Sequence, residues 1–271
     1  MTLILAFIWC RGVVVVGDTR ASMGDLFTEE RKIYSISTED LNLAAVAGSG
    51  DSSLVHQGFE LIERTFLGFL SETGEARNPT EEEVDQIVRL IEERLMSRYS
   101  KLRSFGIRSR AELVLATVSL EGKPLLYHFG PVGLADPVHL GSKYVILGHG
   151  RVTGAQLLLE LLGYKPEIAE YYDMSVFPAF IIDLVSRVDP TVSPFLDPES
   201  SIYIRYSEEE KSVLMGPLKM EEFGKVKNTI KSRLEIIRKA WQLADSREDG
   251  DEYVLELLEK ELEKDNEQPE G

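Results

Sequence analysis

Hydrophobic positions change their spacing several times along the 271 residues, and each change predicts a different element. Four apolar or alternating runs within the first fifty residues read as buried or half-buried strands, at 2–9, 13–17, 31–36 and 41–47. The first two runs form a hairpin that turns at Arg11-Gly12, with Cys10 packed inside it. Four strands in so short a stretch predict an antiparallel sheet.

From Asp51 the apolar spacing becomes three and four, which is typical of one face of a helix. The stripe comprises Leu54, Val55, Gly58, Ile62, Thr65, Phe66 and Phe69. A second helix follows Pro79, where Thr80 and Glu83 have the spacing of a capping box. Its apolar stripe runs through Val84, Ile87, Val88, Ile91 and Leu95.

Strand patterns then return, and a second pair of helices and two last strands follow. The expected strands are 112–120, 123–129, 142–147, 202–206 and 212–215, and the expected helices are 152–163 and 175–188. Two stacked antiparallel sheets with a helix pair on each outer face would bury every amphipathic stripe once. The order therefore predicts an α+β fold, a four-layer α/β/β/α sandwich, in one domain over residues 2–216.

The C-terminal part follows a different pattern. From about Lys219 to Ala244 apolar residues step by three or four, which predicts a long amphipathic helix. Residues 246–251 break this pattern, and a second short helix could fold back on the first. We expect a helical extension at 217–265 and a disordered tail at 266–271.

Charge and composition exclude several classes of function. The net charge of −16 argues against nucleic-acid binding, and 12 acidic against 3 basic residues from Asp245 onward concentrate that acidity in the tail. No apolar run is long enough to span a membrane. A single cysteine and the absence of a signal-peptide pattern favour a cytoplasmic protein. The four histidines lack ligand spacing, so we expect no metal site and no cofactor.

Thr2 is the candidate with the most distinctive chemistry. Removal of Met1 would leave a threonine whose hydroxyl and α-amine can act as nucleophile and base. Such a residue needs a nearby cation to lower the pKa of the amine, a carboxylate to hold that cation, and a backbone N–H for the oxyanion. Asp18, Lys32 and Gly48 are candidates for these roles because each lies at the edge of a predicted strand.

Several short motifs follow one another along the chain, namely Thr2, Val15–Gly24, Arg31–Tyr34, Ala47–Asp51, Leu113–Val118, Gly122–Tyr127 and Gly148–Gly150. In this order and spacing they resemble proteasome β-type subunits and HslV-type relatives, which are threonine peptidases of the N-terminal nucleophile hydrolase superfamily. The resemblance covers roughly residues 2–216.

The resemblance implies that Thr2 is the nucleophile, that Asp18 and Lys32 are the charged pair beside it, and that the Gly48 N–H is the oxyanion donor. It also implies a site Asp and Ser, which match Asp189 and Ser193 although their spacing is one residue longer than the family's.

The sequence differs from the family pattern in two places, and two positions of the specificity pocket can be assigned. His149 replaces the family's serine between two glycines, where it could alter the base, bind a carboxylate or mark lost activity. The Asp18-to-Lys32 interval is two residues shorter, so the loop at the specificity pocket should differ. Ala21 and Val46 are the pocket-wall positions that can be assigned, and both are small or apolar.

The resemblance implies a peptidase that acts on peptides or unfolded proteins through an acyl-enzyme, in a homo-oligomeric ring and with a possible unfoldase ATPase as partner. Two alternatives stay open. The acyl-enzyme could be intercepted by an amine, which would make the protein a ligase or transpeptidase. The chain could also be a catalytically silent subunit of a ring, which His149 and the unusual tail favour.

Each candidate also has a structural explanation. Asp18 could cap a turn, Lys32 could be a solvated surface residue, and Gly48 could permit a sharp strand-to-helix turn. Asp189 precedes a proline and could simply end a helix, and His149 could be an ordinary loop residue.

Overall fold

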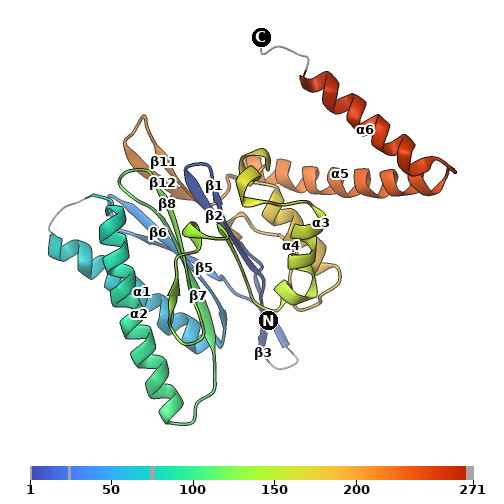
Figure 1. The fold of residues 1–271 in the computed structure, drawn as a ribbon. Helices are drawn as coiled ribbons and strands as arrows, with labels where there is room; N and C mark the ends of the chain where they lie inside the picture. Colours follow the sequence, from blue (N-terminus) through green and yellow to red (C-terminus); the bar gives the residue numbers. More distant parts are fainter. Residues whose placement is uncertain (1, 24–25, 74–76, 267–271) are drawn as a thin grey trace. The chain divides into compact units, whose positions relative to one another are not determined.

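The structure is a computed structural model that describes residues 2–23, 26–73 and 77–266. The chain divides into two compact units, residues 1–223 and residues 224–271. The first unit contains the strands and most of the helices, and it is the one drawn from blue to orange in Figure 1. An α+β fold with antiparallel sheets is therefore confirmed for this unit.

The first sheet has five antiparallel strands in the order β10-β1-β2-β11-β12. Their bounds are β1 Ile4–Trp9, β2 Gly12–Gly17, β10 Tyr144–Leu147, β11 Ser201–Ser207 and β12 Ser212–Gly216. The central strand β2 is buried along its whole length, as its run of four valines predicts. The last two strands thus complete a sheet that the first hairpin begins.

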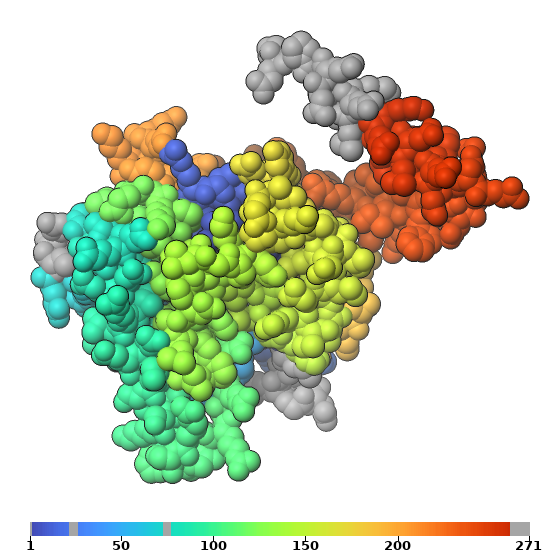
Figure 2. Space-filling view, viewed as in Figure 1, coloured from blue at the N-terminus to red at the C-terminus, as the bar shows by residue number. Residues whose placement is uncertain are grey.

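The hairpin between β1 and β2 turns at Cys10 and Arg11, one residue earlier than expected. Cys10 has a positive φ of 48° and is exposed, so the prediction that it packs inside the hairpin is wrong. It occupies the first of two turn residues, beyond the strand positions that the core covers. In Figure 2 the dark blue atoms of this hairpin show at the surface mainly around its turn.

The second sheet is also antiparallel, in the order β5-β6-β7-β8-β9. Its strands are β5 Ile33–Ser37, β6 Asn42–Gly50, β7 Ala111–Val118, β8 Pro124–Phe129 and β9 Ala135–Asp136. The first four predicted strands therefore do not form one sheet. Two of them belong to each sheet. Strands such as β2 and β6 are buried on both faces, so each needs a second packed layer in addition to the neighbouring strands of its own sheet.

A short hairpin separates the strands of the two sheets along the chain. It consists of β3 Arg20–Met23 and β4 Leu26–Glu29, which form a two-stranded sheet of their own. Sequence reasoning assigned residues 22–25 to a loop and missed both strands, because they are four residues each and lack a clear alternation. Residues 24–25 of that expected loop lie outside the described residues.

The two five-stranded sheets pack face to face. One core cluster joins alternate residues of β1 and β2, such as Ile4, Ala6 and Val15, to alternate residues of the second sheet, such as Ala45 and Ala116. Alternation places every second side chain of a strand on one face, so these residues point into the space between the sheets. Alanines at facing positions let the two layers approach closely.

The outer face of the second sheet is covered by two long helices, α1 Ser52–Thr73 and α2 Glu81–Ser104 (Figure 1). The predicted capping box is present: the Glu83 N–H donates to the Thr80 hydroxyl at 3.3 Å, and the Thr80 N–H donates to the Glu83 carboxylate at 2.8 Å. All five residues of the predicted α2 stripe are buried.

The first sheet packs on its other side against α4 Phe177–Ser186, through rings that include Phe7 and Phe177 at 5.8 Å between centroids. The single helix expected over 152–163 is instead a π-helical segment, η2 Arg151–Ala155, followed by α3 Gln156–Leu161. The backbone of Gly154 is non-helical (φ 171°, ψ −28°), which interrupts regular α-helical hydrogen bonding.

Three short 3-10 turns complete the first unit, namely η1 Val138–Leu140, η3 Pro166–Tyr171 and η4 Pro198–Ser200. The next helix, α5 Met220–Asp245, begins within this unit. Its Phe223 lies 5.4 Å from Phe195 between ring centroids, and both side chains are buried. The two compact units divide at 223–224, and the expected domain boundary at 216–217 stays a prediction.

The second unit contains the rest of α5 and the helix α6 Gly250–Asn266. The predicted break lies between them, where Arg247 stacks over the Tyr253 ring at 4.0 Å. Along α5 the predicted apolar seam includes Trp241, which is 72% exposed. Asn266 ends α6, and the remainder of the tail expected at 266–271 lies outside the described residues. No helix in the described ranges combines the length and apolarity needed to cross a membrane.

Candidate functional site

Thr2 lies two residues before the first residue of β1 and is half-buried. Its carbonyl oxygen accepts a hydrogen bond from the Gly150 N–H at 3.3 Å. A Cβ added to Gly148 would lie 2.0 Å from the same oxygen, and Gly148 has a φ of +88°. The Gly148–Gly150 segment therefore packs directly against Thr2, and only a residue without a side chain fits at position 148.

A buried ion pair lies beside this N-terminal segment. Asp18 follows β2 and Lys32 precedes β5, and Lys32 Nζ lies 2.7 Å from Asp18 Oδ1. The Lys32 side chain is 7% exposed and the Asp18 side chain is 0% exposed. Lys32 Nζ also donates to the Arg20 carbonyl. The structure thus brings together two residues that sequence reasoning paired, although they could each have been a surface or turn residue.

The Asp18 carboxylate also accepts backbone hydrogen bonds from three separate segments. The donors are the Leu3 N–H at 2.8 Å, the Arg20 N–H at 3.1 Å and the Ser193 N–H at 3.2 Å. The Asp18 N–H in turn donates to the Leu3 carbonyl at 3.0 Å. Asp18 therefore fixes the residue after Thr2 relative to Lys32, in the way that a preorganised site requires.

Burial lowers the pKa of Lys32 below its ordinary value, while the neighbouring Asp18 carboxylate opposes this shift. The Lys32 ammonium group is thus poorly solvated and is held by the Asp18 carboxylate. A cation in such a position can lower the pKa of a nearby amine.

Ser193 is fully buried and joins the same cluster. Its Oγ accepts a hydrogen bond from the Thr19 N–H at 2.9 Å and lies 3.0 Å from the Thr19 hydroxyl. The longer spacing after Asp189 therefore does not remove Ser193 from the site. Thr19 is a residue that sequence reasoning missed, and only its position next to Asp18 could have indicated it.

Asp189 precedes Ser193 in the chain and accepts a separate set of hydrogen bonds. Its carboxylate accepts from the Thr191 N–H at 2.9 Å, the Thr191 hydroxyl at 2.6 Å and the Thr153 hydroxyl at 2.8 Å. Burial works to raise the pKa of Asp189, but the hydrogen bonds from Thr191 and Thr153 outweigh it, and the pKa lies below its ordinary value. Asp189 thus connects the segment that carries Ser193 to η2.

His149 is exposed, and its carbonyl accepts the Val152 N–H at 2.9 Å. It lies close enough to Asp189 to contribute to the lowering of that residue's pKa. Its neighbours Gly148 and Gly150 both contact the Thr2 backbone, so His149 belongs to a segment that packs against the nucleophile candidate. This placement agrees with a role beside the site and also with an exposed loop residue.

Gly48 lies in β6, opposite Leu113 of β7. A Cβ there would lie 2.7 Å from Val55 and 2.8 Å from Leu113, so a side chain would disturb the packing of α1 on the sheet. Gly48 and Thr2 line the same cavity. The predicted oxyanion donor and the predicted nucleophile therefore both line one cavity.

This cavity has a volume of about 270 Å³. Of the two predicted wall positions, Ala21 lines it, whereas Val46 packs in the core beneath α1 and α2. Sequence reasoning missed three polar lining residues that belong to no motif, Glu30, Ser52 and His56. His56 lies on the polar face of α1. This position predicts that its side chain is exposed, but it does not predict which loop the side chain contacts.

Comparison with known proteins rests on structure alone, because neither a protein-family profile nor a curated protein matches the chain. Anbu from Hyphomicrobium sp. strain MC1 has a TM-score of 0.61 at 15% identity. Its Gly-1 mutant has a TM-score of 0.62 at 14% identity. In both cases the alignment covers 89% of this chain and 97% of the other. The chain has the fold of Anbu.

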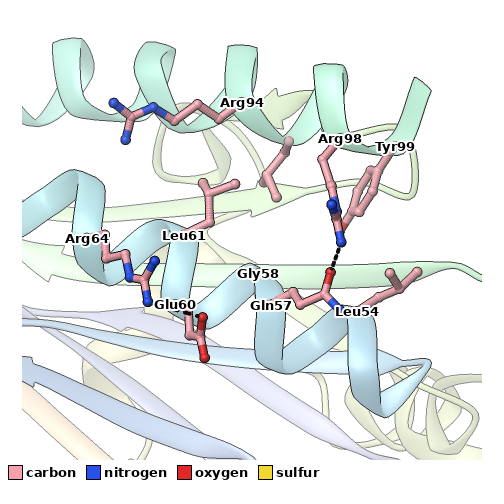
Figure 3. A pocket seen from close by; sticks show the side chains of 10 residues that line it. Leu54, Gln57, Gly58, Glu60, Leu61, Arg64, Arg94, Arg98 and Tyr99 are labelled. Carbon is pink, nitrogen blue, oxygen red and sulfur yellow. Dashed lines mark hydrogen bonds and ion pairs between the residues drawn. The ribbon is translucent and has the colours of Figure 1, made fainter. Parts of the chain in front are cut away.

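Another hollow in this Anbu-like fold lies between α1 and α2 and has a volume of about 340 Å³ (Figure 3). Three arginines line it, and two of them bond to neutral groups: Arg94 to the Thr65 hydroxyl at 2.6 Å and Arg98 to Gln57. Arg64 pairs with Glu60 at 3.6 Å. No residue of the predicted site lines this hollow.

Within the described ranges, no group of three or more histidine, cysteine, aspartate or glutamate side chains is arranged to hold a metal ion. The Asp18–Lys32 pair is the charged cluster that lies beside the N-terminal segment. Its members are buried, bonded to each other and fixed by backbone groups close to Thr2.

Proposed function

We propose that the protein is a threonine-type amide hydrolase of the proteasome-related kind, with Thr2 as its N-terminal nucleophile after removal of Met1. The observation that carries this proposal is the buried Asp18–Lys32 pair, which is bonded to the Leu3 N–H directly after Thr2. A structural ion pair would not need to be tied to this end of the chain. The fold shared with Anbu and the motif resemblance to proteasome β-type subunits support the same conclusion.

In this mechanism the free α-amine of Thr2 takes the proton from Thr2 Oγ1 as that oxygen attacks an amide carbon. Lys32 keeps the amine in its neutral, basic form, and Asp18 holds Lys32 in place. The Gly48 N–H stabilises the negative charge on the carbonyl oxygen. The C–N bond then breaks, and the proton moves to the departing amine.

The product of this first step is an ester between Thr2 and the acyl group. Water attacks the ester, restores the threonine hydroxyl and releases a carboxylic acid. Ser193 and Asp189 act as positioning residues, since their hydrogen bonds go to Thr19, Thr153 and Thr191. His149 acts at the edge of the site through its proximity to Asp189.

The wider properties belong to the same proposal. The two sheets with helices packed on their outer sides form a four-layer α/β/β/α sandwich. The substrate is a peptide or an unfolded protein, the chain works in the cytoplasm as a homo-oligomer, and an unfoldase ATPase is a possible partner. The motif resemblance to ring-forming peptidases supports these expectations.

The test is covalent labelling of Thr2 with an electrophilic peptide probe, followed by intact mass and peptide mapping. We expect Met1 to be absent, one adduct to form on Thr2, and Thr2→Ala to abolish it. Thr19→Val is the comparison variant, because it keeps Thr2 and removes the hydroxyl that lies 3.0 Å from Ser193 Oγ. Retention of Met1 together with no adduct would overturn the proposal in favour of a catalytically silent subunit.

A further inference from the structure

The cavity that contains Thr2 has an acidic wall formed by Glu30. The Glu30 carboxylate lies 2.8 Å from His56 Nε2 and 3.5 Å from the Ser52 hydroxyl, and both partners come from the first turns of α1. These contacts hold the carboxylate at the cavity while its side chain remains 33% exposed. Glu30 is therefore both positioned and accessible to a ligand.

The cationic residues at the cavity are already engaged by carboxylates that do not line it. Arg31 reaches Glu199 at 3.4 Å and donates to the Ile33 carbonyl at 2.9 Å. Lys32 is paired with the buried Asp18. Two acidic lining residues remain, Glu30 and Asp51, and Asp51 accepts the Leu54 N–H at 3.3 Å at the start of α1. Glu30 and Asp51 are thus the carboxylates of the lining, while Arg31 and Lys32, which also line the cavity, each have a carboxylate partner outside it.

The cavity also has an apolar portion next to its acidic wall. Val55 and Phe59 of α1 line it together with Ala21 of β3. A long side chain with an aliphatic stem and a charged end fits such a surface, since the stem can lie on apolar groups while the charge meets a carboxylate. Lysine and arginine have this shape, and a volume of about 270 Å³ accommodates either.

We propose that this cavity selects substrates with a basic side chain on the residue whose carbonyl Thr2 attacks, and that Glu30, oriented by His56, is the residue that determines this specificity. The inference rests on the proposed function. The Asp18–Lys32 pair does not determine which side chains a substrate carries, whereas Glu30 would. Glu30 is a binding residue, and the acyl transfer still depends on Thr2.

The experiment uses three electrophilic peptide probes that differ only in the residue before the electrophile, namely lysine, norleucine or glutamate. The measured quantity is the second-order rate constant of adduct formation on Thr2 in the full-length protein. We expect the lysine probe to react at least about tenfold faster than the norleucine probe, and the glutamate probe to be slowest.

Two variants of Glu30 test the assigned residue. Glu30→Gln should bring the lysine-to-norleucine ratio close to one, and Glu30→Lys should make the glutamate probe faster than the lysine probe. Glu63→Gln, an exposed position on α1 that does not line the cavity, is the matched control and should leave the ratio unchanged.

The outcomes separate the two proposals. Equal rates with all three probes, or a lysine preference that survives in both Glu30 variants, would overturn the specificity and leave Thr2 as the nucleophile. Adduct formation with none of the probes would overturn the hydrolase proposal and the specificity with it.

Discussion

Two hollows of the first unit hold their charged side chains in opposite ways. Near Thr2, the Asp18–Lys32 pair is buried, and the Asp18 carboxylate accepts hydrogen bonds from distant parts of the chain. Between α1 and α2, Arg64, Arg94 and Arg98 are exposed, and their partners come from the same two helices (Figure 3). The hollow between the helices is the larger by volume, at about 340 Å³ against 270 Å³.

The difference shows that the size of a hollow is a poor guide to its chemistry. An exposed arginine keeps most of its hydration and can change rotamer, so its position is weakly determined. A buried charge must be paired and hydrogen-bonded, and its surroundings then fix its position. Chemistry that depends on distances of a few tenths of an ångström therefore suits the Asp18–Lys32 region.

The largest expected effect comes from Lys32→Met. This change leaves the Asp18 carboxylate buried without its cation, which should lower the free energy of unfolding by about 3–5 kcal/mol. We also expect loss of the Thr2 adduct. Urea denaturation and intact mass measure the two effects.

The matched control for Lys32→Met is Arg64→Met. The Arg64–Glu60 pair has side chains that are 79% and 66% exposed, so we expect a change within about 0.5 kcal/mol. Similar losses in the two variants would contradict the contrast between the two hollows.

A smaller effect is expected for Gly148→Ala. The new Cβ would lie 2.0 Å from the Thr2 carbonyl oxygen in a backbone with φ +88°, so Thr2 must move. Overpacking should cost about 1–3 kcal/mol, and the left-handed backbone about 1–2 kcal/mol more. We expect the rate of adduct formation on Thr2 to fall by at least about tenfold, as a displaced reacting group implies.

Gly163→Ala separates these two costs, because Gly163 has a φ of +67° but open space around its Cβ position. It should show the backbone cost alone, with normal labelling of Thr2. Unchanged labelling in Gly148→Ala would show that the Gly148–Gly150 segment does not position the nucleophile.

The smallest effect concerns Glu83, at the start of α2. Hydrogen bonds from Arg77 at 2.7 and 2.8 Å, which outweigh the opposing effect of burial, lower the pKa of Glu83 to about 2. Glutamine can still accept the Thr80 N–H, so Glu83→Gln should lower the free energy of unfolding by only about 1 kcal/mol. Chemical denaturation between pH 2 and pH 7 measures this.

The pH dependence follows from the direction of the shift. A lowered pKa means that the charged Glu83 stabilises the folded state above its ordinary value near 4.5, and that this contribution is lost as the pH falls toward 2. The difference between wild type and Glu83→Gln should therefore be largest above pH 5 and shrink in acid. Glu82→Gln, which changes an exposed neighbour, should show no such trend.

Much of the fold was predictable because it depends on local periodicity. The α2 stripe and its capping box follow from spacing within about fifteen residues, and the structure contains both. The division of the strands between two sheets was not predictable in this way. Whether β2 pairs with β5 or with β11 depends on contacts between residues almost 190 positions apart.

The candidate site shows the same limit. Asp18 and Lys32 could be named because they match a motif, and the structure places them in contact. Glu30 and His56 belong to no motif, and they meet only because the loop before β5 reaches the first turns of α1. A side chain's secondary-structure position indicates whether it is exposed, but its partners depend on the assembled fold.

The hydrogen bond from the Ser193 N–H to Asp18 spans 175 positions of the chain. During synthesis the first twenty residues emerge early, but their charged cluster stays incomplete until the segment around Ser193 has been made and has folded back. Contacts between distant residues form slowly because the intervening chain must first be ordered. A nascent or truncated chain would thus carry Thr2, the proposed nucleophile, without the complete Asp18 cluster, so the proposed reactivity would arise only once most of the protein exists.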